Sequence, residues 1–507
     1  MQLESGVYGL FIDGKVVPSE SGRTFEVTDP STGQVCATVA QGDQKDIDRA
    51  VNAARRAFES GVWSKRTPEE RAQVLENIAK KAMERAQEIA SLEIQSSGAT
   101  IRRMMGADIL GVVEFFLRTA RNVREFPHKE IMEALPIPGP SHTMMVREPV
   151  GVCAAIAPFN FPLMLAVWKV APALAMGNSI VVKPASYTPL TALLLGQICK
   201  EAGVPDGVVN VVPGPGSTAG ESLAGHPGVD KVAFTGSTVV GRRIMQLAST
   251  NIKKVTLELG GKSPNILLED ADLDIAVPGS LFAFLMHNGQ VCESGTRLFV
   301  PEKIHDEVVE RMVAMARKLK IGNPWDMNTD MGPVVSKSQQ ESILKFIEDA
   351  KKEGAKLATG GNAVKPEGYE GGYYVEPTIF TNVKNDMRIA QEEVFGPVLS
   401  VIKYKDLEEA IAMANDTIYG LAGGVWTRDV EKGYQVAARI RAGTVWVNEW
   451  HMLRSDSPFG GYKQSGIGRE NGKVVLEEYS QVKSLHISYT LDRKHKIFYD
   501  RLLNLQA

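Results

Sequence analysis

Near the amino terminus, the spacing of apolar residues changes from every second position to every third or fourth. Residues 10–39 alternate apolar and polar side chains around two turn segments, which predicts β-hairpins. From Lys45 to Ser96 the apolar residues recur with helical spacing, in the stripes Ile47, Val51, Ala54, Phe58 and Val74, Ile78, Ala82, Ile89. These stripes predict helices whose apolar faces pack into a core.

Between Val150 and Leu268, short apolar runs alternate with helical patterns, which predicts βαβ units and a parallel sheet. The runs are Cys153–Ala157, Ile180–Val182, Val208–Val212, Val232–Phe234, Val255–Leu257 and Ile266–Leu268. Pro189 suits the first position of a helix, and Gly203 suits its end. Ligands of parallel sheets bind where strands end, so we expect chemistry in the loops that follow these runs.

A second α/β region is predicted after Pro278. Its pattern predicts two helices and four strands, at Leu281–His287, Ile304–Leu319, Tyr373–Phe380, Val398–Tyr404, Gly423–Trp426 and Thr444–Val447. The tail from Val474 is strand-like over Lys483–Ser488 and then becomes charged and helical. A strand that follows a completed domain is often lent to a neighbouring subunit, so we expect an oligomer, either a homodimer or a homotetramer.

The composition is that of a globular protein and excludes several other classes. The chain has 507 residues, 44% hydrophobic and 23% charged, which corresponds to roughly three domains. Lys and Arg number 57 against 60 Asp and Glu, a net charge of −3 that gives no reason to expect nucleic acid or an anionic membrane. The most apolar stretch, residues 150–182, is interrupted by three prolines and a lysine. We therefore expect no membrane helix, because one needs ~20 apolar residues in a row.

The cysteines and histidines predict no metal site and a reducing compartment. The four cysteines, Cys36, Cys153, Cys199 and Cys292, are widely spaced and form no CxxC pair. The histidines fall in no ligand spacing. The first residues lack the basic and apolar regions of a signal peptide. These features predict a cytoplasmic protein.

Two glycine-containing segments follow predicted strands and are candidate phosphate sites. Gly214–Gly220 departs from the G-x-G-x-x-G spacing by one residue, so a simple turn is an equal alternative. In Phe234–Gly241 a strand ends at Gly236-Ser237 and a helix begins at once, which directs free N–H groups and the positive end of a helix at one point. The alternative there is that Ser237 merely caps the helix.

Two single residues suggest catalysis. Glu258 lies at a strand end in apolar surroundings, where burial would raise its pKa toward that of a general base, although a surface glutamate before a turn is the alternative. Cys292 lies in a glycine-containing turn that could expose a reactive thiol, whereas Cys153 and Cys199 lie in apolar patterns typical of packing. His287 precedes Cys292 by five residues, a helical spacing that points the two side chains apart.

Together these segments resemble the aldehyde dehydrogenase superfamily over essentially the whole chain. The matching segments occur in the family's order, at 158–162, 183–186, 234–237, 257–262, 289–292, 392–397 and 458–466. The resemblance implies an α/β fold with a Rossmann-type cofactor domain, an α/β catalytic domain and a small β oligomerisation element. The implied boundaries are 1–126 and 149–260 for the dinucleotide-binding domain, 261–463 for the catalytic domain, and 127–148 with 474–507 for the oligomerisation element and C-terminal tail.

The resemblance implies oxidation of an aldehyde to a carboxylic acid. Cys292 would attack the carbonyl as a thiolate, and the Asn160 side chain with the Cys292 backbone N–H would stabilise the oxyanion. After hydride transfer, Glu258 would activate the water that hydrolyses the thioester. Lys169 and Glu470 would relay the proton away from Glu258.

The resemblance also implies a site for NADP, NAD or both. It assigns cofactor contacts to Lys183, Ser186, Gly216, Gly236, Ser237, Leu259, Glu393 and Phe395. Lys183 would bind the adenosine ribose, Gly236-Ser237 the pyrophosphate, and Glu393 the nicotinamide ribose. The family often has glutamate where this chain has Ser186. The serine removes a charge that would repel a 2′-phosphate and leaves a donor, so we expect NADP to be accepted, with Lys183 as a phosphate partner.

The resemblance implies a small-molecule aldehyde as substrate and a largely apolar channel. The channel residues would be Phe161, Trp168, Met286, Val291 and Phe459, with Trp450 near the mouth. Aromatic and methionine walls favour an apolar or aromatic aldehyde. Glu293 is an unusual charge directly after the nucleophile, and with His451 and Arg454 it could serve a semialdehyde or amino-aldehyde, or face solvent or a subunit contact.

Three other functions stay open at this point. A CoA-acylating dehydrogenase would pass the thioester to CoA, and Glu258 argues against it because a base for water would lose the acyl group. A redox-free thiol hydrolase would leave the predicted phosphate site without a purpose. A non-catalytic protein of the same fold is disfavoured because Asn160, Glu258 and Cys292 are all present.

Overall fold

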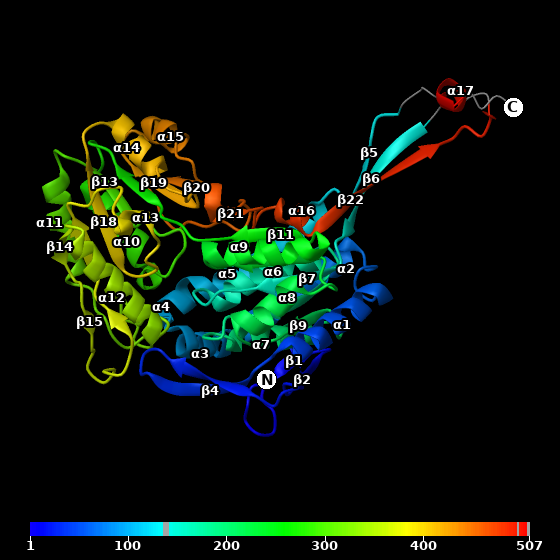
Figure 1. Cartoon of the computed structure of the whole chain (residues 1–507), viewed down its shortest axis with the longest axis horizontal. Coiled ribbons are helices and arrows are strands. Elements are labelled where there is room, and N and C mark those ends of the chain that lie inside the picture. The colour runs from blue at the N-terminus through cyan, green and yellow to red at the C-terminus, as the bar shows by residue number, and fades with distance from the viewer. Residues whose placement is uncertain (135–140, 494–495, 504–507) are drawn as a thin grey trace.

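The computed structural model describes residues 1–134, 141–493 and 496–503, which form two sheet-centred lobes and a projecting arm (Figure 1). Parts of the predicted oligomerisation element and tail, at 135–140, 494–495 and 504–507, lie outside the described residues. Among the described residues, none of the helices is both long and apolar enough to cross a membrane.

The first lobe contains an eight-stranded sheet in the order β2-β1-β9-β8-β7-β10-β11-β21. Its strands are β1 (Leu10–Ile12), β2 (Lys15–Val17), β7 (Val152–Ile156), β8 (Ser179–Lys183), β9 (Val209–Val211), β10 (Lys231–Thr235), β11 (Lys254–Glu258) and β21 (Gly466–Ile467). The strands from β9 to β11 are parallel, while β2, β1 and β21 extend the two edges in antiparallel pairing. The five predicted runs up to Val255–Leu257 are therefore confirmed as one parallel sheet.

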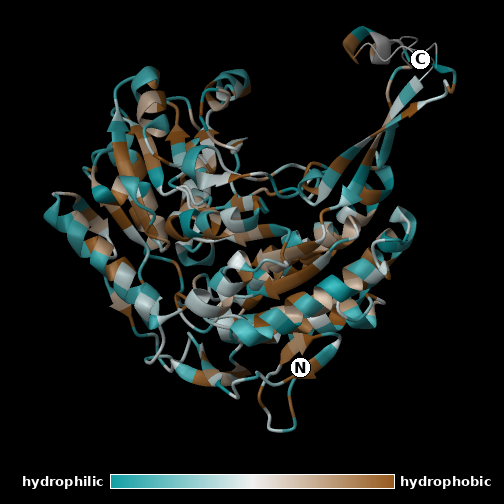
Figure 2. Ribbon diagram, turned by 45° about the vertical axis from the view of Figure 1, so that its right-hand side comes forward, coloured by the Kyte–Doolittle hydropathy of each residue, from teal (hydrophilic) through white to brown (hydrophobic). Residues whose placement is uncertain are grey.

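Helices cover both faces of this sheet because alternate strand residues point to opposite sides. Cys153 and Ala155 of β7 pack into one core, and Ala154 and Ile156 pack into the other. The first core contains α2 (Pro68–Glu84), α3 (Ala86–Ser97), α5 (Ile109–Glu125), α6 (Pro162–Ala175) and α7 (Leu190–Glu201). The second contains α1 (Gln44–Ser60), α8 (Glu221–Gly225) and α9 (Thr238–Ala248). Figure 2 shows hydrophobic residues gathered on the strands and polar residues on the outer helices.

The second lobe contains a seven-stranded sheet in the order β14-β17-β18-β13-β12-β19-β20. Its strands are β12 (Pro264–Leu267), β13 (Arg297–Pro301), β14 (Lys356–Thr359), β17 (Thr378–Thr381), β18 (Val398–Tyr404), β19 (Ala422–Trp426) and β20 (Thr444–Val447). Helices α10 (Leu273–Leu285) and α11 (His305–Ala316) pack on one face, and α12 (Lys337–Lys352), α14 (Leu407–Asn415) and α15 (Val430–Ala437) pack on the other.

Four details of the pattern-based prediction are wrong. The single strand expected at Tyr373–Phe380 is divided at Pro377, which has no N–H group to donate, into β16 (Tyr374–Val375) and β17, which belong to different sheets. The run Ile266–Leu268 forms β12, which belongs to the second sheet and pairs with β13 and β19. The helix expected at Leu281–His287 begins at Leu273 and includes Pro278, and it ends earlier because His287 and Asn288 have φ values of 48° and 56°. Pro189 is the N-cap of α7, one position before the first helical residue.

Two hairpins confirm the alternating pattern at the amino terminus. The β1–β2 pair extends the first sheet, and β3 (Thr24–Asp29) pairs with β4 (Gln34–Ala40). A small antiparallel pair in the second lobe joins β15 (Ala363–Val364) and β16 (Tyr374–Val375).

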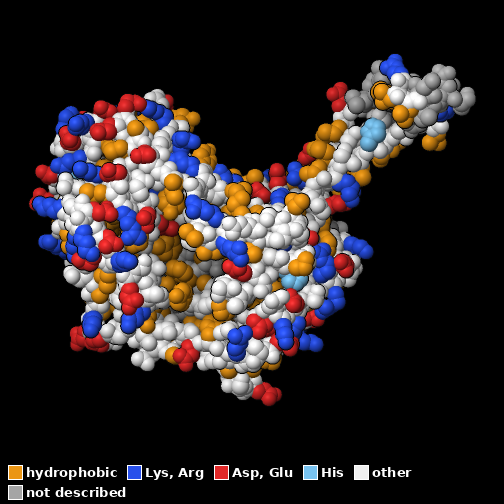
Figure 3. All heavy atoms as spheres, viewed as in Figure 1, with side chains coloured by type: hydrophobic (Ala, Val, Ile, Leu, Met, Phe, Trp, Pro, Cys, Tyr) orange, Lys and Arg blue, Asp and Glu red, His pale blue; other side chains and the backbone are white. Residues whose placement is uncertain are grey.

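The arm is a three-stranded sheet of β5 (Lys129–Ile131), β6 (Ser141–Pro149) and β22 (Ser480–Ser488). The carboxyl-terminal strand β22 pairs with β6 of its own chain along its whole length, which differs from a strand lent to another subunit. Ile131, Val482 and Leu485 are exposed on the arm, and Figure 3 shows hydrophobic side chains along it. Beyond the arm, α17 (Ile497–Leu503) lies near the carboxyl terminus.

Candidate active site

The order of strands in the first sheet identifies where a ligand can bind. From β7 the chain moves outward through β8 and β9, and it then returns to the other side of β7 with β10 and β11. The loops that leave β7 and β10 therefore diverge and leave a crevice at the carboxyl ends of these strands. Asn160 lies in the loop after β7, and Gly236-Ser237 lie directly after β10.

A cavity of about 760 Å³ occupies this crevice. Seven of the eight predicted cofactor residues line it, namely Lys183, Gly216, Gly236, Ser237, Leu259, Glu393 and Phe395. Ser186 does not line the cavity; its hydroxyl donates a hydrogen bond to the Gly214 carbonyl oxygen at 3.0 Å. The donor that the sequence assigned to a bound phosphate is thus engaged within the loop.

The start of α9 gives the cavity a site for an anion. Ser237 caps this helix and accepts a hydrogen bond from the Val240 N–H, so both the capping and the phosphate-site interpretations of the segment are compatible. The first N–H groups of a helix have no partner within the helix, and its dipole is positive at this end. Val239, Val240 and Ile244 of the same helix supply an apolar wall, which suits the flat face of a base.

Two ionisable groups of the cavity have shifted pKa values because they are buried. Burial lowers the pKa of Lys183 to about 8, which leaves it able to carry a proton near neutral pH. Burial raises the pKa of Glu393 to about 7, although the Gly261 N–H donates a hydrogen bond to it at 3.2 Å. A Cβ on Gly260 would collide with the Glu393 carboxylate, so the paired glycines after Glu258 allow this approach.

Sequence reasoning missed several residues at this cavity. Glu221 and Arg243 form a 2.7 Å ion pair on its wall, and Gln339 and Ser342 reach it from α12 of the second lobe. Their own segments carry no motif, because packing of separate helices brings them together. Only the position of Glu221, directly after the glycine-rich segment, could have suggested a role.

A second cavity of about 210 Å³ meets the first at Cys292, Asn160 and Thr235, which line both. Of the predicted channel residues, Phe161, Trp168, Met286 and Phe459 line it. Val291 and Trp450 do not: both are buried, and Trp450 packs with Ala283, Ala422 and Trp446. His451, the residue after Trp450, reaches the cavity instead.

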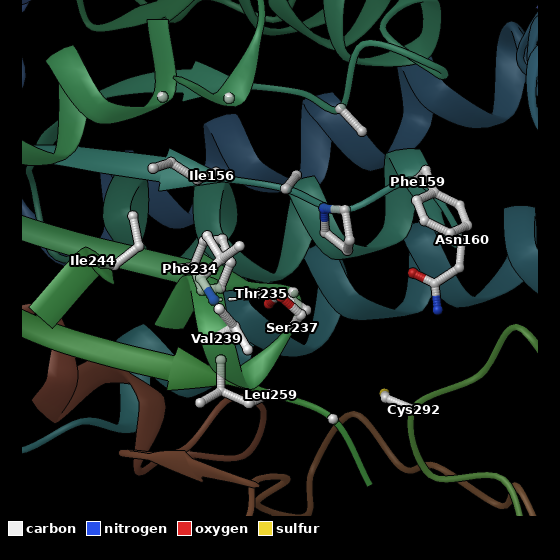
Figure 4. Close-up of a pocket in the computed structure, with 18 of the residues that line it drawn as sticks. Ile156, Phe159, Asn160, Phe234, Thr235, Ser237, Val239, Ile244, Leu259 and Cys292 are labelled. Carbon is white, nitrogen blue, oxygen red and sulfur yellow. Dashed lines mark hydrogen bonds between the residues drawn. The ribbon is translucent and has the colours of Figure 1, made fainter. Parts of the chain in front are cut away.

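Asn160 and Cys292 face one another where the cavities meet. Figure 4 shows the Asn160 amide pointing from its loop toward Cys292, which lies on a separate segment. Asn160 is buried, and its amide donates one hydrogen bond to the Gln290 carbonyl oxygen at 2.8 Å. This bond fixes the amide while its second hydrogen stays available to an oxygen bound beside Cys292.

Glu258 is buried at the end of β11 and lines the smaller cavity. Burial first, and then the nearby Glu470 carboxylate, raise the pKa of Glu258 well above its usual value, while Lys169 opposes them. Lys169 donates hydrogen bonds to Glu470 at 2.6 Å and to Thr235 at 2.7 Å, and it is fully buried. Of the predicted catalytic residues, Lys169 and Glu470 therefore bond one another and lie close enough to Glu258 to affect its pKa.

Cys153 and Cys199 lie in the packed interior, as the sequence predicts, while Cys36 and Cys292 are partly exposed. Cys153 and Cys199 are fully buried in the core of the first lobe, whereas Cys292 is partly exposed and lines both cavities. Burial first, and then the adjacent Glu293 carboxylate, raise the pKa of the Cys292 thiol well above its usual value. His287 packs against the Phe161 ring with 5.8 Å between ring centroids. In the described part of the chain, no cluster of His, Cys, Asp and Glu is arranged to hold a metal ion.

Comparison with known proteins finds similar sequences and structures over nearly the whole chain. The sequence profile of the "Aldehyde dehydrogenase family" matches residues 16–485. A betaine aldehyde dehydrogenase of Bacillus subtilis is 45% identical over 479 residues, covering 94% of this chain and 96% of that protein. A Staphylococcus aureus betaine aldehyde dehydrogenase variant with NAD+ bound is 40% identical, superimposes with a TM-score of 0.94, and covers 100% and 99% of the two chains. An NAD+ complex of a Bacillus cereus aldehyde dehydrogenase is 45% identical with a TM-score of 0.92, covering 96% and 97%.

Proposed function

We propose that this chain, which belongs to the aldehyde dehydrogenase family, uses its two connected cavities to oxidise an aldehyde to a carboxylic acid with NAD or NADP. The observation that carries the proposal is the meeting of a dinucleotide-sized cavity and a small apolar cavity at Cys292. A cofactor and an aldehyde that entered from the two sides would both reach this sulfur.

The larger cavity fits a dinucleotide by its chemistry as well as its size. Ser237 and the start of α9 would hold the pyrophosphate, Lys183 the adenosine ribose, and Glu393 the nicotinamide ribose, with Phe395 packing nearby. Gly216 and Leu259 would complete the walls. When bound, the oxidised nicotinamide supplies the hydride acceptor that turns the Cys292 adduct into a thioester.

Cys292 and Asn160 would carry out the addition step. The thiol proton is released to solvent, Sγ forms a bond to the aldehyde carbon, and the carbonyl electron pair moves onto oxygen. The free Asn160 amide hydrogen and the Cys292 backbone N–H would stabilise this oxyanion, and one such donor is typically worth ~3–4 kcal/mol. Because the Gln290 carbonyl fixes the amide in advance, little reorganisation is needed.

Glu258 would act in hydrolysis of the thioester. Its raised pKa makes it a stronger base than an exposed carboxylate once it has lost its proton. It would take a proton from water as the water oxygen attacks the thioester carbon and Cys292 leaves. The Lys169–Glu470 pair would then carry the proton away, through the contacts described above.

For the substrate we propose an apolar or aromatic aldehyde of modest size. Phe161, Trp168, Met286 and Phe459 form the walls of the smaller cavity. Two charged groups at this cavity are paired within the protein: Arg454 binds Asp456 at 2.8 Å, and Glu293 contacts His451 at 3.2 Å. These pairings weaken the argument for a semialdehyde held by Arg454.

For the cofactor we propose that NADP is accepted beside NAD, because Ser186 places no carboxylate near the adenosine ribose. Arg243, on the wall of the larger cavity, would offer a positive charge to a 2′-phosphate in exchange for its pairing with Glu221.

We further propose that the first lobe is the dinucleotide-binding domain, the second the catalytic domain, and the arm the oligomerisation element, with the boundaries given by the sequence. Exposed Ile131, Val482 and Leu485 on the arm favour a homodimer or homotetramer. A cytoplasmic location remains a prediction from the sequence.

The proposal is tested by the absorbance of reduced nicotinamide, with NAD and NADP compared over aromatic, aliphatic and semialdehyde substrates in the absence of CoA. We expect turnover with aromatic or aliphatic members, loss of turnover in Cys292→Ala, and a Cys292 acyl adduct that accumulates in Glu258→Gln by intact-protein mass spectrometry. A requirement for CoA would identify the acylating alternative. No turnover together with no calorimetric binding of either dinucleotide would contradict the proposal.

A further inference from the structure

The residue after the nucleophile contacts the reacting sulfur directly. The Cys292 Sγ–H donates to Glu293 Oε2 at 3.2 Å, and Glu293 faces the smaller cavity. With 4% of its surface exposed, Glu293 is buried. A buried carboxylate needs hydrogen-bond donors or a cation, and the thiol is one of its two partners.

His451 is the second partner and fixes the carboxylate in place. Its Nδ1 lies 3.2 Å from Glu293 Oε1, so the two carboxylate oxygens are divided between the histidine and the thiol. The imidazole is buried, and it packs edge-on against the Phe282 ring with 5.1 Å between centroids. The backbone of His451 has a φ of 60°, a conformation that non-glycine residues adopt rarely. The surrounding structure therefore holds His451 in position against a local conformational cost.

The other charged groups around Sγ are mainly carboxylates. Glu258 approaches from the end of β11 and Glu393 from the loop before β18, and both add to the effect of Glu293 on the thiol. Burial alone would raise the pKa of the Glu293 carboxyl. His451 and the Cys292 hydrogen bond outweigh this effect and hold the pKa below its usual value.

Other charges near the cavity are directed elsewhere. Lys169 binds Glu470, Arg454 binds Asp456, Asp108 binds Arg103, and Glu114 contacts Arg118. Among the described residues, Glu293 is therefore the carboxylate that forms a hydrogen bond with Cys292 Sγ.

We propose that Glu293 is a further catalytic residue, which His451 orients so that its carboxylate keeps the Cys292 nucleophile protonated and hydrogen-bonded in the free enzyme. The proposal rests on the proposed role of Cys292 as nucleophile. A negative charge at this distance opposes formation of a second negative charge on sulfur. The hydrogen bond to Oε2 must therefore open before the thiol can add to a substrate.

The direct test is the pH dependence of Cys292 alkylation by iodoacetamide in the full-length protein without substrate or cofactor. In Glu293→Gln the amide oxygen can still accept a hydrogen bond but carries no charge. We expect the midpoint of the alkylation profile to fall by at least one pH unit. One unit gives tenfold more thiolate, and the lower basicity makes each thiolate ~3-fold less nucleophilic, so alkylation at pH 7.5 should become ~3-fold faster or more.

Two matched proteins make this result specific. Cys292→Ala reports the background from the other three cysteines, and its signal also shows whether Cys292 is the reactive thiol at all. Glu307→Gln removes an equal charge from an exposed site on α11, where Glu307 pairs with Arg311, and it should keep the wild-type profile. An unchanged or higher midpoint in Glu293→Gln would overturn the proposal.

His451→Gln provides a second test that keeps the Glu293 carboxyl. Without His451, burial should raise the Glu293 pKa, so that the carboxyl becomes neutral at higher pH than in the wild type. Alkylation should then be faster between pH 6 and 7 and converge with the wild type at higher pH, where Glu293 is ionised. Melting curves identify any variant that fails to fold, and a wild-type profile in a folded His451→Gln protein would also contradict the proposal.

These outcomes are distinguishable from failure of the proposed oxidation. Alkylation requires neither cofactor nor aldehyde, so a protein that oxidises no aldehyde can still show the shift. Conversely, a protein that oxidises aldehydes through Cys292 can lack the shift, and then Glu293 alone loses its assigned role.

Discussion

Replacement of Lys169 by methionine tests whether the buried charges behind Glu258 control hydrolysis of the thioester. Methionine has nearly the length of lysine and leaves no charge or hydrogen-bond donor. It removes the 2.6 Å contact with Glu470 and the 2.7 Å contact with Thr235. The substitution therefore leaves two buried carboxylates, Glu258 and Glu470, without the cation that bonds Glu470 and lowers the pKa of Glu258.

The magnitude follows from the charges around Glu258. A nearby opposite charge typically lowers a carboxyl pKa by ~1–3 units, and Lys169 acts in this direction on Glu258. In the variant the pKa of Glu258 should rise further by ~1 unit or more. Only the deprotonated base can activate water, so hydrolysis increases as pH rises through this pKa. On the acidic side of the profile each unit removes ~10-fold of the active base, and we expect hydrolysis there to be ~10–100-fold slower.

Stopped-flow measurement of reduced nicotinamide separates the affected step from the others. Addition and oxidation precede hydrolysis, so Lys169→Met should show a rapid burst of one equivalent followed by a slow steady state. The steady-state rate should recover toward the wild-type rate at high pH. Lys231→Met is a matched control. Lys231 is also fully buried, but it lies at the first residue of β10, at the end of the strand away from Thr235, and donates a hydrogen bond to Thr256. Lys231→Met should lower the melting temperature without displacing the pH profile.

The double variant Lys169→Met, Glu470→Gln decides between a charge effect and a loss of packing. Glu470 raises the pKa of Glu258 more strongly than Lys169 lowers it. Removing both charges should therefore bring the pH profile of hydrolysis to or below that of the wild type, although the packing is doubly altered. The double variant also lacks the proposed proton relay, so its maximal rate can stay low, but a midpoint of the pH profile as high as in Lys169→Met would refute the reasoning.

Three further predictions concern other parts of the molecule. Asn160→Ala should slow the burst by ~10²–10³-fold, because one oxyanion donor is lost; unchanged calorimetric affinity for the dinucleotide would exclude a general disruption. Ser186→Glu should lower kcat/KM with NADP relative to NAD by tenfold or more, and an unchanged ratio would remove the basis of our cofactor proposal. Burial raises the pKa of Glu93 to about 7, so its favourable contribution is present below pH ~4.5 and is lost as pH rises to about 7. Relative to the wild type, the unfolding free energy of Glu93→Gln should therefore increase by ~3 kcal/mol between pH 4.5 and pH 8, as urea denaturation at both pH values would show.

Much of the fold followed from local patterns. The runs that form β7, β8, β9, β10 and β11 were recognisable because a strand buried on both faces reads as a short continuous apolar segment. The start of α9 was recognisable because Gly236-Ser237 interrupts the apolar run at the point where a helical pattern begins. Local sequence could not assign β12 to a sheet, because the same apolar run fits either one. Its partners, β13 and β19, are distant in sequence.

The candidate site shows the same limit at the level of single residues. The family resemblance suggested Val291 as a channel residue and Trp450 as a residue near the mouth, yet their side chains pack into the interior, and His451 reaches the cavity. Glu221, Arg243 and Gln339 carry no recognisable motif, and only the packing of α8, α9 and α12 brings them to the larger cavity. Edge pairing of β21 with β11 likewise depends on contacts between segments far apart in the sequence.

The sequence by itself determined which chemical groups are available and which local elements carry them. It pointed to Cys292 as the candidate nucleophile, Glu258 as the candidate base and the helix start after Ser237, because residue types and hydrophobic periodicity are visible in short segments. The sequence also predicted that burial would raise the pKa of Glu258, but only the tertiary structure decided which charged groups surround Glu258 and Cys292. Glu293 follows Cys292 in the chain, but its contact with His451, and the contacts that bring Lys169 and Glu470 to Glu258, arise from segments that meet only on folding. Electrostatic coupling depends on distance and burial in space, and neither quantity is encoded in residue spacing along the chain.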